Sequence, residues 1–417
     1  MSPRKLLILG ASAAEIFIVE RARKMGVYTI VSDHYTDRTL SPAKNFADEA
    51  WDISWTDFDA LSAKCRERGV NGVLAGFSEF RVHSMIKLCG ILGLPAYITE
   101  EQLFKTADKT EFKKCCQKYG VPVVPAFAPD DPEMIFPVIV KPADRGGSIG
   151  IAVAHNREEY ENAKTHALEL SPCGNVVVEK YMGDCTKFDV YYVVRAGVPE
   201  LVASNDTVMC PRAKGQEILQ AAWTFPSASE SVYREKIDVS VRKMLRGLGI
   251  IDGYITISGF VDANREMYIF ETGFRLSGDF SFKYTERVFG RNYIDMLIGH
   301  ALRGNATNIP RELGNTATAH AMIAVNYFAK DGRAKNVKID EKLKNSENAE
   351  LILCEFGSKY DSHGGLLKKS AMLFCHGKTM PEAAKTYEEF FDAYDLTDEN
   401  GASLVYYRPT FKNDFEK

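Results

Sequence analysis

The sequence lacks the features that mark secreted, membrane-spanning and nucleic-acid-binding proteins. Its nine cysteines include no CxxC pair and no Cys/His cluster at metal-ligand spacing, which favours reduced thiols over a disulfide framework or a zinc site. No apolar run approaches the roughly 20 residues that a membrane-spanning helix needs. The formal net charge is only -4, so neither nucleic acid nor a membrane surface is expected as a partner. We therefore expect a cytoplasmic protein.

The composition is that of a globular protein with more than one core. Of its 417 residues, 45% are hydrophobic and 26% are charged. This length exceeds what one ordinary core supports and suggests two or three domains. The sequence contains no internal repeat, low-complexity tract or long linker, so we expect the domains to pack closely.

The first hundred residues alternate short apolar runs with helical patterns. Strands are predicted at Leu6–Leu9, Tyr28–Ser32 and Gly72–Ala75, and helices at Ala14–Met25 and Phe58–Arg68. This alternation predicts a small parallel sheet with helices on both faces.

A glycine-rich hairpin is predicted at Phe136–Ile151, which reads FPVIVKPADRGGSIGI. An apolar strand ends at Lys141, and a loop containing Gly146, Gly147 and Ser148 precedes the next strand. Glycine allows close backbone approach, so the N–H groups of this loop can wrap phosphates, and the lysine adds a flexible point charge. The loop lacks the GxxxxGK[ST] order of a Walker P-loop. An ordinary turn is the alternative for the hairpin alone.

Three further segments accompany this hairpin. ADKTEFKK opens a helix at Ala107, and VVVEKYMG at Val176–Gly183 ends a strand whose backbone can face an adenine edge. The third, Gly259–Gly278, is a hairpin whose second strand ends at Glu271, four residues before Arg275. A strand-terminal glutamate can hold Mg²⁺ between phosphates, and an arginine can neutralise a transferring phosphoryl group. Taken singly, the Val176–Gly183 segment is explained as an ordinary strand end, and Glu271 with Arg275 as a surface ion pair.

In this order and at these spacings, the four segments resemble the ATP-grasp superfamily, which includes carbamoyl-phosphate synthetase, biotin carboxylase and purine-biosynthetic ligases. The resemblance runs through the whole chain and implies an α/β and α+β multidomain fold. It implies a parallel α/β pre-ATP-grasp domain over residues 1–105 and a central ATP-grasp domain over 106–310, with a mobile lid at about 126–178. A small C-terminal α+β domain over 311–417 is expected to pack on the ATP-grasp core.

The resemblance also implies roles for individual residues. Glu271 matches the main Mg²⁺-binding glutamate, and Arg275 matches the catalytic arginine beside the acyl-phosphate site. Lys109 and Lys141 match the two lysines that contact the ATP phosphates. Gly146, Gly147 and Ser148 match the lid loop, and residues 179–182 match the hinge that receives adenine. The matching ATP-binding positions are Lys109, Lys141, Gly146, Gly147, Ser148, Glu179, Lys180, Tyr181 and Met182.

Two positions of the family's metal site differ in this sequence. The asparagine that completes that site is Gly273 here, and the earlier metal carboxylate falls near Ser258 or Gly259. Because phosphates and waters supply most Mg²⁺ ligands, a site with one protein carboxylate is feasible. Asp262 and Asp279 are candidate substitutes.

The ribose-binding position differs as well. The glutamate that takes the ribose hydroxyls in the family is Cys185 here, so the neighbouring Asp184 is the candidate replacement.

The loop that begins at Leu9-Gly10 ends a strand and opens a helix, as in dinucleotide-binding units. It lacks the second and third glycines of GxGxxG, which argues against a dehydrogenase. The resemblance implies that this loop and Ser78-Glu79 face the acceptor-substrate site. Ordinary turns of a scaffold domain are the alternative.

The implied activity is an ATP- and Mg²⁺-dependent carboxylate–amine ligase, in which Mn²⁺ could replace Mg²⁺. A carboxylate would be activated as an acyl phosphate, and an amine-type nucleophile would then form a C–N bond, releasing ADP and phosphate. The expected partners are a small-molecule carboxylate and an amine, and a homodimer is compatible with the sequence. The alternatives are a nucleotide-binding protein without catalysis and a bicarbonate-activating carboxylase.

Overall fold

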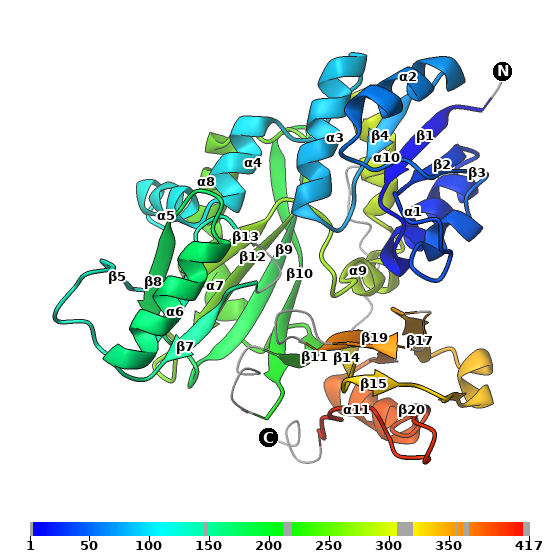
Figure 1. The fold of residues 1–417 in the computed structure, drawn as a ribbon. Helices are drawn as coiled ribbons and strands as arrows, with labels where there is room; N and C mark the ends of the chain where they lie inside the picture. The colour runs from blue at the N-terminus through cyan, green and yellow to red at the C-terminus, as the bar shows by residue number, and fades with distance from the viewer. Residues whose placement is uncertain are drawn as a thin grey trace.

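The computed structural model describes residues 3–145, 149–211, 219–306, 320–355, 357, 359–361 and 367–411. Over these residues the chain combines a parallel N-terminal sheet, a separate small antiparallel sheet and a large antiparallel sheet (Figure 1). The mixed α/β fold with a parallel N-terminal unit, predicted from the sequence, is confirmed. No helix of the described segments is long and apolar enough to cross a membrane.

The N-terminal unit is a four-stranded sheet in which every strand runs parallel to its neighbours, in the order β3-β2-β1-β4. Buried aliphatic side chains of the central strand form its core. The strands and helices are β1 (Lys5–Leu9), α1 (Ala13–Lys24), β2 (Tyr28–Ser32), η1 (Pro42–Asn45), β3 (Glu49–Trp51), α2 (Phe58–Arg68), β4 (Gly72–Leu74) and α3 (Glu79–Leu92).

Two short helices, α4 (Glu100–Ala107) and α5 (Lys109–Lys118), follow the N-terminal sheet. The sequence predicts one helix over Thr106–Tyr119, and the structure differs because the chain is extended at Asp108, with φ -75° and ψ 120°. The Asp108 carboxylate accepts hydrogen bonds from two backbone N–H groups of the first turn of α5, each at 2.9 Å. This N-cap starts a new helix and fixes Lys109 in its first turn.

The lid is a small antiparallel sheet, ordered β5-β8-β6-β7, with one helix packed on it. It has its own apolar core around the fully buried Tyr160, so it is held together separately from the rest of the protein. Its elements are β5 (Ala126–Phe127), β6 (Val138–Pro142), β7 (Ala152–Ala154), α6 (Arg157–Leu170) and β8 (Val176–Lys180).

The large sheet has eight antiparallel strands in the order β13-β12-β9-β10-β11-β14-β19-β17. The pairing of β11 with β14 continues the sheet from the central region into the C-terminal region, so the domain boundary at 310/311 remains a prediction. The strands are β9 (Thr186–Arg195), β10 (Val198–Met209), β11 (Gln220–Phe225), β12 (Gly253–Val261), β13 (Met267–Gly273), β14 (Ala321–Ala329), β17 (Ala349–Leu353) and β19 (Lys368–Gly377).

Helix α11 packs on β14 and β19 and closes a second apolar core at the C-terminal end of the large sheet. The remaining elements are α7 (Glu230–Lys236), α8 (Asp238–Gly247), α9 (Phe282–Phe289), α10 (Ile294–Arg303), β15 (Gly332–Arg333), β16 (Asn336–Ile339), η2 (Glu341–Asn345), β18 (Lys359–Tyr360), α11 (Met380–Glu389) and β20 (Tyr394–Thr397).

Helix α10 joins the N-terminal unit to the rest of the molecule (Figure 1). It packs so closely on β4 that a side chain at Gly72 would place its Cβ 2.4 Å from the carbonyl oxygen of Ala301. Arg21 of α1 also pairs with Asp295 at the start of α10 and with Glu286. The N-terminal unit is therefore fixed against α9 and α10 by contacts far apart in sequence.

Candidate functional site

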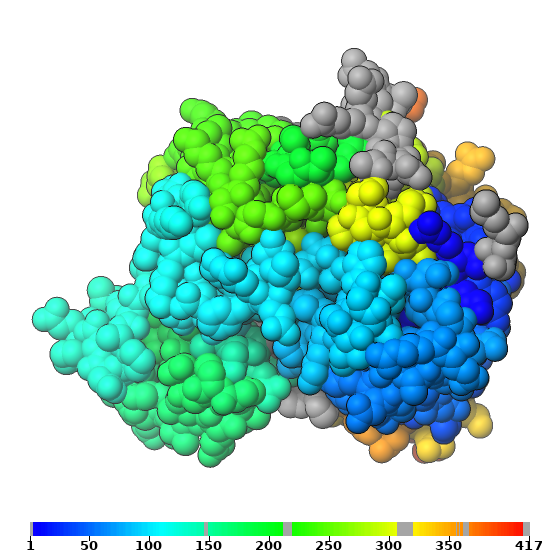
Figure 2. Space-filling model, turned by 90° about the horizontal axis from the view of Figure 1, so that it is seen from above, coloured from blue at the N-terminus to red at the C-terminus, as the bar shows by residue number. Residues whose placement is uncertain are grey.

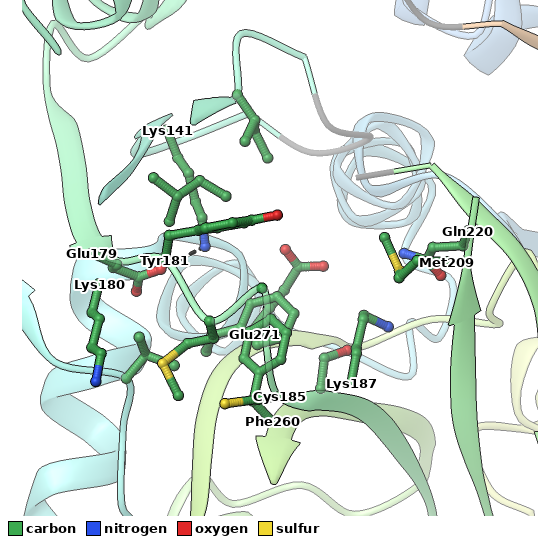
Figure 3. A pocket seen from close by; sticks show the side chains of 17 residues that line it. Lys141, Glu179, Lys180, Tyr181, Cys185, Lys187, Met209, Gln220, Phe260 and Glu271 are labelled. Carbon is green, nitrogen blue, oxygen red and sulfur yellow. Dashed lines mark hydrogen bonds and ion pairs between the residues drawn. The ribbon is translucent and has the colours of Figure 1, made fainter. Parts of the chain in front are cut away.

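A cavity of about 170 Å³ lies between the lid and the large sheet. It brings together the lid strand end at Lys141, the hinge Glu179–Met182 and Glu271 of β13, which are distant in sequence (Figure 3). Its other lining residues are Val124, Ile139, Ile151, Gly183, Cys185, Lys187, Met209, Gln220, Ser258, Phe260 and Phe270.

The Glu179 side chain is buried between two lysines. Its carboxylate lies 2.5 Å from the Nζ of Lys141 and 2.5 Å from the Nζ of Lys113. Although burial opposes ionisation, the two lysines hold the pKa of Glu179 below its ordinary value. The carboxylate is therefore charged and committed to the lysines. Lys113 was not assigned from the sequence, because nothing local to α5 reveals a partner in β8.

The walls of the cavity are largely apolar. Phe260 and Phe270 stack with ring centroids 4.9 Å apart, and the Nζ of Lys141 lies 4.9 Å from the Phe270 centroid. In Figure 3 the Tyr181 ring reaches across the cavity, whereas the Lys180 side chain points away from its centre. An apolar slot with a few polar groups suits a flat heteroaromatic base.

One row of polar side chains crosses three strands of the cavity floor. Ser258 of β12 stands opposite Glu271 of β13 on one side and opposite Asp189 of β9 on the other. The Ser258 hydroxyl donates to Asp189 at 2.5 Å, and the Lys187 ammonium lies 2.9 Å from the same carboxylate. Lys187 was missed in the sequence, although its i, i+2 spacing from Asp189 puts both on one face of a strand. The row places the Lys187 ammonium group in the same cavity as Glu271.

A second, smaller polar cavity of about 20 Å³ adjoins the first. It is lined by Glu79, Lys109 and Arg275, and it shares Glu271 and Phe270 with the larger cavity. Glu271 thus lies where the two cavities meet, and the residues described include no side-chain ion pair to it.

The charged groups of the small cavity are only loosely paired. The Nε of Arg275 lies 3.8 Å from the Glu79 carboxylate, and the Nζ of Lys109 donates to the Arg145 carbonyl at 2.5 Å. Burial raises the pKa of Glu79, with the negative charge of Glu271 adding to that effect against Arg275 and Lys109. Burial lowers the pKa of Lys109, because the charged form of a lysine is its protonated form. Among the described residues, these charges therefore lack a full set of partners.

Several predicted residues lie elsewhere. Gly146, Gly147 and Ser148 fall outside the described residues. Asp184 lines a side cavity beyond the hinge together with Asp262, while Cys185 lines both that cavity and the main one.

The two candidate substitutes for the missing metal carboxylate line neither of the cavities that Glu271 lines. Asp262 sits in the turn between β12 and β13, where it accepts hydrogen bonds from two backbone N–H groups. Asp279 is buried and accepts a hydrogen bond from the Tyr191 hydroxyl. The register instead puts Ser258 beside Glu271, so the structure favours neither substitute.

The N-terminal loop is closed by a salt bridge. Gly10 adopts φ +94°, and the guanidinium of Arg81 covers the place where a Cβ would lie. Arg81 pairs at 3.1 Å with Glu15, which is fully buried. The second N-terminal segment, Ser78-Glu79, is the one that reaches the small cavity, which Glu79 lines.

Comparison with known proteins matches this geometry. Residues 126–272 fit the family model described as "D-ala D-ala ligase C-terminus". The large chain of carbamoyl phosphate synthase from Pyrococcus furiosus is 33% identical over 113 residues, which are 25% of this chain and 10% of that protein. The crystal structure of an L-amino acid ligase from Bacillus licheniformis superposes with a TM-score of 0.77 at 17% identity, covering 96% of this chain and 100% of that one. The chain has the ATP-grasp fold.

A second solved structure shows what an ATP-grasp fold of this shape can hold. The biotin carboxylase domain of 2-oxoglutarate carboxylase from Hydrogenobacter thermophilus superposes with a TM-score of 0.78 at 17% identity, covering 95% of this chain and 91% of that one. It was solved with MgADP, ADP and bicarbonate. The matches cover only 10% to 47% of the curated relatives' lengths.

The residues of this site fit a single Mg²⁺ ion. Within the described segments there is no group of three or more His, Cys, Asp or Glu side chains that could hold a metal by themselves. Glu271 offers a carboxylate at the junction of the two cavities, and Ser258 offers a hydroxyl opposite it. Mg²⁺ commonly takes one or two protein carboxylates and completes its shell with phosphates and water.

Proposed function

We propose that the protein is an ATP-dependent ligase that activates a small-molecule carboxylate as an acyl phosphate and joins it to an amine. The observation that carries this proposal is the position of Glu271, which lines both the larger cavity at the hinge and the small cationic cavity. A phosphoryl group passing from ATP to a carboxylate has to cross such a junction. The alternative acceptor, bicarbonate, would use the same junction.

The nucleotide end of the site is proposed to lie along the hinge. The base would fit between Tyr181, Met182 and Phe260, with the backbone of Glu179–Met182 at its edge. Lys141 would reach the phosphates from the lid side and Lys187 from the sheet side. Asp184, in the side cavity next to the hinge, remains the candidate for the ribose hydroxyls.

The small cavity is proposed to receive the carboxylate. Arg275 presents a planar fork that can pair with a carboxylate through two hydrogen bonds. Its Nε has no hydrogen-bond partner among the described residues although it is buried, so it is available to an anion. Lys109 adds a second positive charge on the same side.

In the first step a carboxylate oxygen attacks the γ-phosphorus of ATP, the bond to the β-phosphate oxygen breaks, and ADP leaves. Arg275 and Lys141 neutralise the charge that spreads over the transferred group, which is the main protein contribution in phosphoryl transfer. Bound Mg²⁺, held by Glu271, would neutralise further charge on the phosphates.

In the second step the amine nitrogen attacks the acyl carbon and the bond to the phosphate oxygen breaks. The products are an amide, hydrogen phosphate and one proton, counted from a protonated amine. Closure of the lid over the site would exclude water, which would otherwise hydrolyse the acyl phosphate.

The acyl phosphate can be trapped without knowing the natural amine. Hydroxylamine added with ATP, Mg²⁺ and a panel of ¹⁸O-labelled amino and small organic acids would convert any acyl phosphate to a hydroxamate. We expect an acid-dependent hydroxamate and phosphate that carries one ¹⁸O atom. Nucleotide binding with neither product for any acid would favour the non-catalytic alternative, and labelled phosphate from bicarbonate alone would favour the carboxylase.

A further inference from the structure

A wide groove adjoins the small cavity at Glu79. It has a volume of about 790 Å³ and runs between α3, α4, the segment before α2 and the base of the lid. Figure 2 shows the hollow between the lid and the N-terminal helices. This volume lies within the range of 300 to 1,000 Å³ that is usual for small-molecule sites.

Aromatic side chains dominate the walls of the groove. Trp55 and Phe58 line it from one side, and Phe80 and Phe104 from the two helices. Phe80 is 47% exposed and Phe104 is 58% exposed. Single exposed apolar residues are common, but several that converge in one concavity mark a binding surface.

The groove leads directly to the small cavity of the reaction site. Glu79 and Ala107 line both spaces. From Glu79 onward one face of α3 follows the groove, because the positions Phe80, His83, Ser84 and Lys87 repeat at i, i+3, i+4 and i+7. A molecule lying along this face would present one end at Glu79.

The charge of the groove favours a cation at that end. Its lining includes four carboxylates and one lysine, which lies over the Phe58 ring at 4.4 Å from the centroid. One further cation, the Arg145 guanidinium, lies 5.9 Å from the centroid of the Phe80 ring. The lining carboxylates are Glu79, Glu100, Asp108 and Asp144. The 3.8 Å separation between Glu79 and Arg275 is longer than a hydrogen bond, so the Glu79 carboxylate keeps acceptor sites for an ammonium group.

We propose that this groove binds the bulky apolar part of the amine substrate and that Glu79 receives its ammonium group. The inference rests on the ligase function proposed above and names its amine as a primary amine with an alkyl or aromatic body. Such a substrate would lie with its nitrogen at the junction where the acyl phosphate forms.

Binding can be measured without any reaction. Trp55 lines the groove, so primary amines from methylamine to hexylamine, and phenethylamine, should change the fluorescence of the full-length protein, and Trp55→Phe should remove the change. Affinity should rise about fourfold for each added CH₂ group. Matched alcohols should bind more weakly, and Glu79→Gln should abolish this preference for the amine.

Phe104→Asp tests the apolar wall, because the residue is exposed enough for the change to leave folding intact. This variant should lose the dependence on chain length, whereas Phe46→Asp, at a site that is 41% exposed and outside the groove, should keep it. Equal binding of methylamine and hexylamine, or unchanged binding by Phe104→Asp, would overturn the proposal. A wild-type dimer that Phe104→Asp converts to a monomer would also overturn it, by assigning the groove to a second copy.

Hydroxylamine is too small to use the groove, so the two proposals fail separately. Hydroxamate formation without chain-length dependence removes only the amine assignment. Chain-length-dependent binding with no acid-dependent hydroxamate removes the ligase, and with it the role of the amine as a substrate, but leaves the groove as an amine-binding site.

Discussion

Ser258 of β12 lies directly opposite Glu271 of β13, and its hydroxyl donates to Asp189 on the other side at 2.5 Å. Asp189 is also paired with Lys187 at 2.9 Å, so it is fully occupied within the protein. Of the two carboxylates in this row, Glu271 is therefore the one left to face a ligand. Under the proposed function, this row would form part of a phosphoryl-transfer site with a reduced set of acidic side chains.

Lys141 and Lys113 allow the nucleotide contact to be separated from the structural one. Both pair with Glu179 at 2.5 Å, but only Lys141 lines the nucleotide cavity. Replacing either with alanine leaves the buried carboxylate with one lysine and should lower the free energy of unfolding by about 1–3 kcal/mol. Urea unfolding of Lys141→Ala and Lys113→Ala checks this.

The two variants should differ in nucleotide affinity. Lys141→Ala should lose most ATP affinity in calorimetric titration, and Lys113→Ala should keep most of it. Equal losses in both would mean that Lys141 acts only by holding Glu179.

Arg275 is expected to act in the transition state rather than only as an ion-pair partner of Glu79. Arg275→Lys keeps the charge but loses the planar fork, so the rate of hydroxamate formation should fall about a hundredfold with ATP affinity unchanged. Glu79→Gln removes the ion pair and keeps the guanidinium, so it should lose far less of this rate than Arg275→Lys. If both variants lost stability and kept their rate per folded molecule, Arg275 would be a structural residue.

The sequence predicted the features that depend on local patterns of residues. The order of the glycine-rich hairpin, the hinge and the strand ending at Glu271 led to the fold, because each segment carries its own pattern of apolar and polar residues. The helix break at Asp108 was missed, since an N-cap inside a helical pattern looks like one more polar position until its backbone turns.

Pairings between distant segments could not be predicted. Lys113 meets Glu179 only because α5 packs against the lid hinge, and Ser258 meets Glu271 only through the register of β12 and β13. The candidate metal ligands Asp262 and Asp279 are close to Glu271 in sequence, but they line neither of its cavities. The wide groove at Phe80 and Phe104 depends on how α3 and α4 pack, which no local pattern states.

A buried histidine, His376, paired with the half-buried His320, should make stability depend on pH. The Nε2 of His320 lies 3.0 Å from the Nδ1 of His376, and burial lowers the pKa of His376 to about 3, with Arg287 and His320 contributing. The unfolded chain binds a proton at His376 below about pH 6.5, whereas the folded chain does not. This contribution to stability is therefore complete above pH 6.5 and is lost as the pH falls toward 3.

Urea unfolding at pH 7.5 and pH 5.5 measures this effect. His376 alone should lower the free energy of unfolding by about 1 kcal/mol over this interval. His376→Asn should remove that part of the difference, and the exposed His166→Asn should not. An unchanged difference in His376→Asn would show that the pair does not control acid stability.

The most direct test of the central claim is the Mg²⁺ dependence of nucleotide binding in Glu271→Gln. Calorimetric titration with a non-hydrolysable ATP analogue should show that Mg²⁺ strengthens binding to the wild type and to Glu266→Gln. Glu266 is a matched control because it stands just before the same strand, exposed, and pairs with Lys236 at 2.6 Å. Glu271→Gln should bind the analogue without the Mg²⁺ enhancement. Full enhancement in Glu271→Gln, or no binding of the analogue by the wild type, would contradict the account.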